Sequence, residues 1–303
     1  MDKIELAMLQ ALPLDLKIAK SKLRIEEWVR YMGKENVYIS FSGGKDSTVL
    51  LHLVRSLYPD IPAVFVDTGL EYPEIKQFVK GMENVTILRP EMSFKQVIEK
   101  YGYPMVSKEQ ANYLDDIRNS TPYMRKRRLE GDEQGRYKLS KKYHYLVDAP
   151  FKISHRCCNV MKKKPVKKYE KETGKVPFIG TMACESILRE QAYLRNGCNA
   201  FDSKRPLSTP MGFWTEQDVL EYIVTNNLKI ASVYGDIVKK EGKYSTTKCD
   251  RTGCVFCGFG IHLEKGENRY QRLEKTHPQL HSYCMNNLGF KEVCEFMGIP
   301  YKN

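Results

Sequence analysis

No long apolar run is present in this sequence. The first twenty residues, MDKIELAMLQALPLDLKIAK, carry charged side chains throughout, so this segment predicts neither a secretory signal peptide nor a membrane-spanning helix. Internal repeats and low-complexity tracts are missing as well. We therefore expect a cytoplasmic globular protein with no membrane partner, whose 303 residues form one large domain or two modest ones.

Positive charge is in excess, and the excess is concentrated in one part of the chain. The formal net charge is +12, and residues 121–175 hold 17 Lys and Arg against 6 Asp and Glu, an excess of 11. Such a window is typical of a site for a polyanion, here a nucleotide, DNA or RNA, or an anionic metal cluster. A solvated basic face without any partner is the simpler alternative.

Apolar segments of strand length alternate with segments of helical spacing along the chain. The expected strands are residues 37–41, 62–69, 84–90 and 175–183, and the expected helices are residues 14–32, 47–57, 73–80, 93–101 and about 185–195. Ser93 is the expected N-cap of one helix, and Thr215 with Asp218 forms an approximate capping box for another. This alternation predicts an α/β fold with a doubly wound parallel sheet.

Three domains or segments are expected from these patterns. Residues 1–34 form an N-terminal helical segment, and residues 35–228 form a nucleotide-binding domain. A basic, Tyr-rich stretch at about 103–156 interrupts the alternation and predicts a helical insertion that covers one face. Residues 229–303 have no clear strand series, so we expect a Cys-rich C-terminal extension packed on the main domain.

The segment SGGKDS, residues 42–47, follows the first expected strand and opens a helix. A Walker loop requires Gly five residues before Gly44, where Ile39 occurs, and Ser or Thr after Lys45, where Asp46 occurs, so a Walker loop is excluded. The segment still suits a phosphate. Glycines let the backbone approach an anion, N–H groups at a helix start point outward, and the serine hydroxyls and the lysine add donors and charge.

SGGKDS resembles the PP-loop of the ATP pyrophosphatase superfamily, and later segments are similar to its phosphoadenosine-phosphosulfate (PAPS) reductase-like family. The similar segments are VDTGLEYPE at 66–74, LRP at 88–90, RCC at 156–158, GTMACES at 180–186 with Arg189, and Trp214 with Asp218-Val219. The resemblance covers about residues 35–260 and implies the adenine nucleotide alpha hydrolase-like fold. Members bind ATP and work at its α-phosphate, or they bind an adenylyl sulfate.

The resemblance also implies which residues contact an adenine nucleotide, whether ATP, PAPS or adenylyl sulfate (APS). The implied nucleotide contacts are Ser40, Ser42, Gly43, Gly44, Lys45, Asp46, Ser47, Asp67, Thr68, Gly69, Glu71, Glu185 and Arg189. Lys45, Asp46 and Asp67 are the expected catalytic residues. Asp46, Asp67 and Glu71 are expected to contact Mg²⁺ or the ribose.

One residue departs from the family pattern. Met182 occurs where the family usually has Arg after the fourth strand. If that Arg contacts nucleotide phosphate, then Arg189 or a lysine of the basic window has to compensate here, or binding is weaker.

Five of the nine cysteines fall into two groups, Cys157-Cys158 and a C-x4-C-x2-C segment formed by Cys249, Cys254 and Cys257. In a cytoplasmic protein, clustered cysteines bind metal more often than they form disulfides. Thiolates this closely spaced can converge on zinc or on a [4Fe–4S] cluster, and each of these takes four ligands.

Two ligand sets are implied by the resemblance. APS reductases hold a [4Fe–4S] cluster with a Cys-Cys pair and a distant C-x2-C, which Cys157, Cys158, Cys254 and Cys257 fit. The DNA-phosphorothioation sulfurtransferases have a different pattern, which Cys158, Cys249, Cys254 and Cys257 fit. We take the second set as the expected ligands, with Cys157 competing with Cys249, and we favour the cluster over zinc.

The remaining cysteines and the nearby histidines are given no ligand role. Cys284 is a reserve ligand, and Cys184, Cys198 and Cys294 are expected to be buried small hydrophobes. His262, His277 and His281 are expected to be surface or packing residues.

The expected reaction is sulfur transfer at an adenylyl centre. A PAPS or APS reductase needs a nucleophilic cysteine, which in that family lies in a C-terminal E-C-G-(L/I)-H segment, and neither Cys284 nor Cys294 has this context. We therefore favour ATP-dependent activation of an oxygen acceptor, such as nucleic acid, with sulfur supplied by a cluster, a cysteine or a donor protein. A reductase and a non-catalytic nucleotide-binding regulatory protein are the alternatives.

Overall fold

The computed structural model describes residues 1–303, which divide into two compact units. The first unit comprises Met1–Asp67, Glu71–Arg89 and Pro165–Thr252. The second comprises Thr68–Leu70, Pro90–Lys164 and Gly253–Asn303. The expected division of the chain into residues 1–34, 35–228 and 229–303 is a statement about which segments fold by themselves. It stays a prediction.

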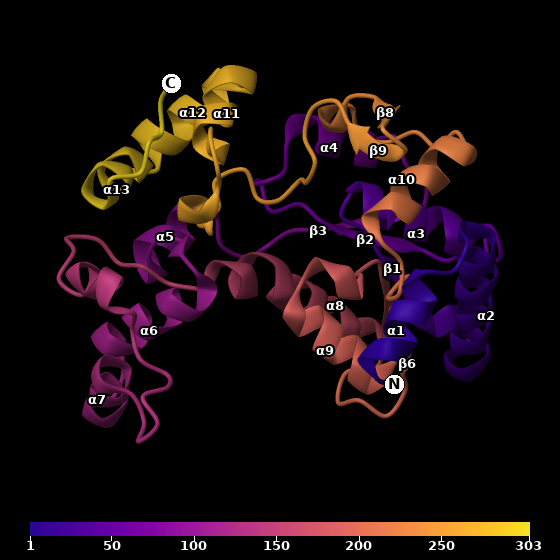
Figure 1. Ribbon diagram of the computed structural model, residues 1–303, viewed down its shortest axis with the longest axis horizontal. Helices are drawn as coiled ribbons and strands as arrows, with labels where there is room; N and C mark the ends of the chain where they lie inside the picture. The colour runs from indigo at the N-terminus through magenta and orange to yellow at the C-terminus, as the bar shows by residue number, and fades with distance from the viewer. The chain divides into compact units, whose positions relative to one another are not determined.

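A six-stranded sheet organises the first unit (Figure 1). Its strands, in spatial order, are β3 (Val85–Leu88), β2 (Ala63–Val66), β1 (Val37–Ser40), β5 (Val176–Ile179), β7 (Leu207–Ser208) and β6 (Asn199–Ala200). All neighbours run parallel except β6 and β7. The predicted α/β fold with a parallel sheet is confirmed.

Helices pack on both faces of this sheet. The helices and helical turns of the first unit are α1 (Lys3–Gln10), α2 (Leu14–Met32), η1 (Lys34–Asn36), α3 (Lys45–Arg55), α4 (Pro73–Lys80), α8 (Lys164–Thr173), η4 (Ala183–Glu185), α9 (Ile187–Asn196), α10 (Glu216–Thr225) and η5 (Ser232–Tyr234). Trp28 of α2 packs edge-on against Phe178 of β5. Tyr38 of β1 packs against Tyr169 of α8. Phe178 pairs in register with Ile39, and side chains alternate along a strand, so the two aromatic contacts lie on opposite faces.

The second unit is mainly helical. Its elements are α5 (Phe94–Tyr101), β4 (Met105–Val106), α6 (Lys108–Asn119), α7 (Pro122–Glu130), η2 (Lys141–Leu146), η3 (Asn159–Lys163), β10 (Gly258–Phe259), η6 (Ile261–Leu263), α11 (Arg269–Thr276), α12 (Pro278–Ser282), η7 (Tyr283–Asn287) and α13 (Phe290–Met297). Strands β4 and β10 pair in parallel. The Phe290 ring contacts those of Phe94, Tyr103 and Tyr270, which joins the C-terminal helices to the middle of the chain.

Several local predictions are confirmed. Helix α2 ends at Gly33, Ser93 caps α5, and Thr215 forms a capping box with Asp218 at the start of α10. No helix combines the length and the apolar character that a membrane crossing requires.

After residue 229, where the sequence has no clear strand series, the structure contains a hairpin that was not predicted. Strands β8 (Ile237–Lys240) and β9 (Lys243–Thr246) form an antiparallel hairpin. Three of its eight strand residues are lysines and two more, Ser245 and Thr246, carry a short polar side chain. This polarity hides the alternation that a half-buried strand usually displays. Gly242, with φ of 79°, forms the turn.

Candidate nucleotide site and cysteine pocket

The phosphate-binding loop connects β1, which ends at Ser40, to α3, which begins at Lys45. Gly43 has φ of 72°, and a Cβ there would lie 2.8 Å from methyl carbons of both Ile75 and Val79. Only glycine tolerates this combination of a left-handed backbone and a close approach. The loop is therefore packed tightly on α4 before it enters α3.

Hydroxyl groups hold the loop in shape. The Ser42 and Ser47 hydroxyls lie 3.0 Å apart, and the Ser42 N–H donates to Ser47 Oγ at 3.1 Å. The Gly44 N–H donates to Ser42 Oγ at 3.3 Å, while Ser47 and Thr48 both donate to the Gly44 carbonyl at 3.0 Å. The predicted serines thus build the loop, and Ser42 is also exposed to solvent.

Lys45 is buried at the first position of α3. Its Nζ donates to the Asp250 carbonyl at 2.7 Å and lies 3.0 Å from a carboxylate oxygen of Glu216. Its backbone N–H donates to the Tyr234 hydroxyl at 3.2 Å. An ammonium and an N–H at a helix start are the groups that would meet a phosphate, and protein groups satisfy both in this structure.

Asp46 carries a buried oxygen, Oδ1, that has no hydrogen-bond partner. Burial raises the pKa of Asp46, Lys45 opposes this rise, and Glu185 adds to it. A buried carboxylate oxygen without a partner is costly, and a bound cation would satisfy it. Mg²⁺ prefers oxygen ligands of this kind, so the residue fits the magnesium site expected here.

Glu185 links two arginines beside this loop. Its carboxylate, 11% exposed, pairs with Arg189 and accepts from Arg251 at 2.7 Å. The same carboxylate accepts the Met182 N–H at 2.9 Å, while the Met182 side chain is buried. The predicted contacts Glu185 and Arg189 therefore lie together, and Arg251 joins them.

The segment after β2 supplies the remaining predicted nucleotide contacts. Asp67, in the first unit, forms an ion pair with Lys76 at 2.9 Å. Thr68 and Gly69 belong to the second unit, where Thr68 is buried and accepts the Leu70 N–H at 3.2 Å. Gly69 has φ of 77°. The roles of Asp67, Thr68, Gly69 and Glu71 in nucleotide binding stay predictions.

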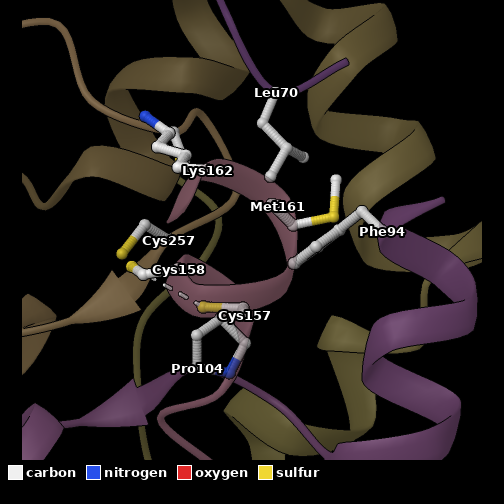
Figure 2. Close-up of a pocket in the computed structure, with 9 residues that line it drawn as sticks. Leu70, Phe94, Pro104, Cys157, Cys158, Met161, Lys162 and Cys257 are labelled. Atoms are coloured by element: carbon white, nitrogen blue, oxygen red, sulfur yellow. Dashed lines mark hydrogen bonds between the residues drawn. The ribbon is translucent and has the colours of Figure 1, made fainter. Parts of the chain in front are cut away.

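Four cysteines line one pocket of the second unit. Its lining residues are Leu70, Phe94, Pro104, Cys157, Cys158, Met161, Lys162, Cys254 and Cys257. Figure 2 shows the Cys158 and Cys257 side chains pointing toward each other. The Cys157 thiol donates to Cys158 Sγ at 4.0 Å. Two sequence groups about one hundred residues apart thus meet, although no three Cys, His, Asp or Glu side chains are spaced to hold a metal ion.

The charge around the pocket favours a thiolate. The hydrogen bond from Cys157, together with the charges of nearby Lys108, Lys162 and Lys163, lowers the pKa of Cys158 to about 5. The same hydrogen bond and burial raise the pKa of Cys157. Because the thiolate is the form that binds metal, Cys158 is the best prepared ligand of the four.

Cys249 lies in the first unit and does not line this pocket. Its thiol donates to the Arg251 carbonyl at 3.0 Å, and its carbonyl accepts the Thr246 hydroxyl at 3.1 Å. The choice between Cys157 and Cys249 as a ligand stays a prediction.

The family assignment rests on a comparison with protein-family models. The model of the phosphoadenosine phosphosulfate reductase domain matches residues 36–131 and 125–258, which is well over half of the chain. The chain belongs to this PAPS reductase family. The resemblance seen in the PP-loop and the later motifs is confirmed.

Individual members of the PAPS reductase family are distant. An uncharacterized protein of Methanocaldococcus jannaschii is 25% identical over 280 residues, 87% of this chain and 51% of that protein. The phosphoadenosine 5'-phosphosulfate reductase of Xanthomonas euvesicatoria pv. vesicatoria is 31% identical over 120 residues, 37% of this chain and 46% of that enzyme. The chain thus spans about half the length of these curated relatives. A solved structure of PAPS reductase from Candida auris has 14% identity and a TM-score of 0.42, covering 80% of this chain and 98% of that one.

Cysteines outside the pocket are mostly buried in this PAPS reductase-family member. Cys198, Cys284 and Cys294 are buried, as expected for Cys198 and Cys294. The same prediction for Cys184 is wrong, because Cys184 is exposed on η4 and its thiol donates to the Trp214 carbonyl at 3.4 Å.

The three histidines fit their expected packing or surface roles. His262 bonds to the Tyr143 hydroxyl, His277 to the Thr276 hydroxyl and His281 to the Tyr301 carbonyl.

Sequence reasoning missed the residues that hold Lys45. Glu216, Tyr234, Asp250 and Thr252 all lie more than 160 positions beyond the loop, and the Tyr234 hydroxyl lies 2.7 Å from Thr252 Oγ1. No local motif marks them. The C-x4-C-x2-C pattern is the one motif that the sequence analysis found in that part of the chain, and Asp250 and Thr252 lie between its first two cysteines.

Proposed function

We propose that this protein is a PP-loop enzyme of sulfur metabolism that binds ATP and transfers sulfur to an activated oxygen acceptor. The observation that carries the proposal is the arrangement around α3. Lys45 and the first N–H groups of the helix occupy the position for a pyrophosphate group, beside Asp46 with its buried, unpartnered oxygen. Membership of the PAPS reductase family supports the adenylyl class of substrate.

The proposed chemistry has two steps. An oxygen of the acceptor attacks the α-phosphorus of ATP, the bond to the β-phosphate oxygen breaks, and pyrophosphate leaves with the electron pair. A sulfur nucleophile then displaces AMP from the adenylated acceptor. Lys45 and the loop N–H groups would stabilise the charge of the departing pyrophosphate. Mg²⁺, held by Asp46, would supply further positive charge at the phosphates.

The cysteine pocket supports an iron–sulfur centre held by this chain. Cys157, Cys158, Cys254 and Cys257 provide the four thiols that a [4Fe–4S] cluster requires, and the pocket favours Cys157 over Cys249. The nearby side chains of Lys108, Lys162 and Lys163 suit a site that becomes anionic when four thiolates bind a metal centre. Such a cluster would supply sulfur-carrying or electron-transfer chemistry.

A PAPS reductase is the second candidate, and the family match supports it. That reaction requires a thiolate that attacks the sulfate sulfur. Cys284 and Cys294 are both 0% exposed, and burial raises the pKa of both thiols. Neither thiol is exposed to a substrate in this fold, and this supports ATP-dependent transfer over the reductase reaction.

Nucleic acid is the proposed acceptor. The Arg127 and Arg136 guanidinium groups lie 5.0 Å and 5.5 Å from the centre of the Tyr137 ring, and that ring is 46% exposed. Arginines around an exposed aromatic ring, within a basic window, suit a phosphate backbone with a stacked base. A separate sulfur-donor protein would complete the reaction.

Two turnover assays on anaerobically purified protein test this proposal. Pyrophosphate release from ATP is measured with and without DNA or RNA, and sulfite release is measured from PAPS with thioredoxin. We expect pyrophosphate release that depends on nucleic acid, and no sulfite. Asp46→Ala should abolish the release, while Asp60→Ala, which removes only a surface ion pair with Lys34, should retain it. Sulfite release without pyrophosphate release would favour the reductase.

A further inference from the structure

Residues 249–252, here called the strap, lie against the phosphate-binding loop of the first unit. The Asp250 carbonyl accepts from Lys45 Nζ at 2.7 Å, and the Thr252 hydroxyl lies 2.7 Å from the Tyr234 hydroxyl, which in turn accepts the Lys45 N–H. The Cys249 N–H donates to the Val233 carbonyl at 3.3 Å, which anchors the start of the strap. The strap is therefore held against the start of α3 through Lys45 and Tyr234.

Arg251 projects from this strap toward Glu185. Its guanidinium donates to Glu185 at 2.7 Å while the side chain stays 63% exposed. Glu185 already pairs with Arg189 and accepts the Met182 N–H, so this nearly buried carboxylate does not depend on Arg251 for neutralisation. A guanidinium has five N–H donors, so Arg251 keeps donors that face solvent beside the loop.

We propose that Arg251 is a phosphate-binding residue of the nucleotide site, an inference that rests on the proposed function. The guanidinium can bind two phosphate oxygens at once, whereas Lys45 offers a single charge. The carboxylate of Glu185 holds Arg251 next to the backbone of Met182, an apolar residue that cannot contact phosphate. Arg251 therefore adds, from a distant part of the chain, a second guanidinium beside that of Arg189 at this strand end.

Binding of ATP and of AMP distinguishes this role from a purely structural one. Titration calorimetry with Mg²⁺ is performed on the wild type, Arg251→Ala, Arg251→Lys and Arg24→Ala, the last being a control that loses another arginine–carboxylate pair, with Glu27. We expect Arg251→Ala to weaken ATP binding about tenfold or more and AMP binding less than about twofold, because only ATP has the β- and γ-phosphates. Arg251→Lys should lie between the wild type and Arg251→Ala, and Arg24→Ala should match the wild type.

Two results would overturn the inference while leaving the proposed function intact. One is unchanged ATP affinity in Arg251→Ala, and the other is an equal loss for ATP and AMP, which indicates a structural role for the Glu185 pair. A wild-type protein that binds neither nucleotide would instead refute the proposed function itself. If Arg251→Ala does not fold, Arg251→Lys is compared with the wild type at raised salt, where the loss of a bidentate contact should be most visible. Equal ATP affinities of the two proteins would then count against the role.

Discussion

Gly43 offers a sensitive test of how the phosphate-binding loop is built. Alanine at this position adopts the left-handed backbone, which costs about 1–2 kcal/mol, and its Cβ would lie 2.8 Å from methyl carbons of Ile75 and Val79. Overpacking of this kind costs about 1–3 kcal/mol more. We therefore expect Gly43→Ala to lower the free energy of unfolding of the first unit by about 2–5 kcal/mol in total.

Gly174→Ala is the matched control, because Gly174 has φ of 70° but no atom within 4 Å of the added Cβ. It should lose only about 1–2 kcal/mol, so the difference between the variants isolates the contact with α4. Both tryptophans, Trp28 and Trp214, are 0% exposed in the first unit, so their fluorescence during urea unfolding reports on that unit. Equal losses in the two variants would refute the close packing of the loop against α4.

Three further predictions follow from the site. Burial raises the pKa of Asp46 above its ordinary value. At pH values above the ordinary pKa of a carboxyl group, ionisation of Asp46 therefore lowers the free energy of unfolding. Asp46→Asn should therefore raise the free energy of unfolding at pH 7, and a gain that persists below about pH 3, where both states are protonated, would contradict this. In the native protein a maleimide should modify the exposed Cys184 and spare the buried Cys198, as mass spectrometry can establish. Cys157→Ala should remove iron and visible absorbance from anaerobically purified protein, and Cys249→Ala should not; the opposite result would favour Cys249 as the ligand.

Much of the fold was predictable because its signals are local. Four parallel strands, β1, β2, β3 and β5, appear as short apolar runs, and each is followed by a segment of helical spacing. Capping residues such as Ser93 and Thr215 mark helix starts within three positions of their partners. The β8–β9 hairpin was not predictable in the same way, because its exposed, Lys-rich residues lack the alternation that marks a half-buried strand.

The candidate site was predictable only in its contiguous parts. SGGKDS and the two cysteine groups are motifs, whereas Tyr234 and Asp250 reach Lys45 through the tertiary fold, about 190 and 205 positions away. Cys184 was predicted to be buried because cysteine is usually buried, but a turn at the carboxyl end of β5 exposes it. Long-range contacts of this kind leave no periodic signal in a single sequence.

Binding of ATP at Lys45 tests the central claim most directly. Titration calorimetry of Mg²⁺-ATP should give binding by the wild type and a loss of about 10–100-fold in Lys45→Ala, because a charge-assisted contact to phosphate is removed. Lys34→Ala, which loses only an exposed ion pair with Asp60, should bind as tightly as the wild type. Equal affinities in the wild type and Lys45→Ala, or no binding of ATP by the wild type, would contradict the assignment of residues 42–47 as a nucleotide phosphate site.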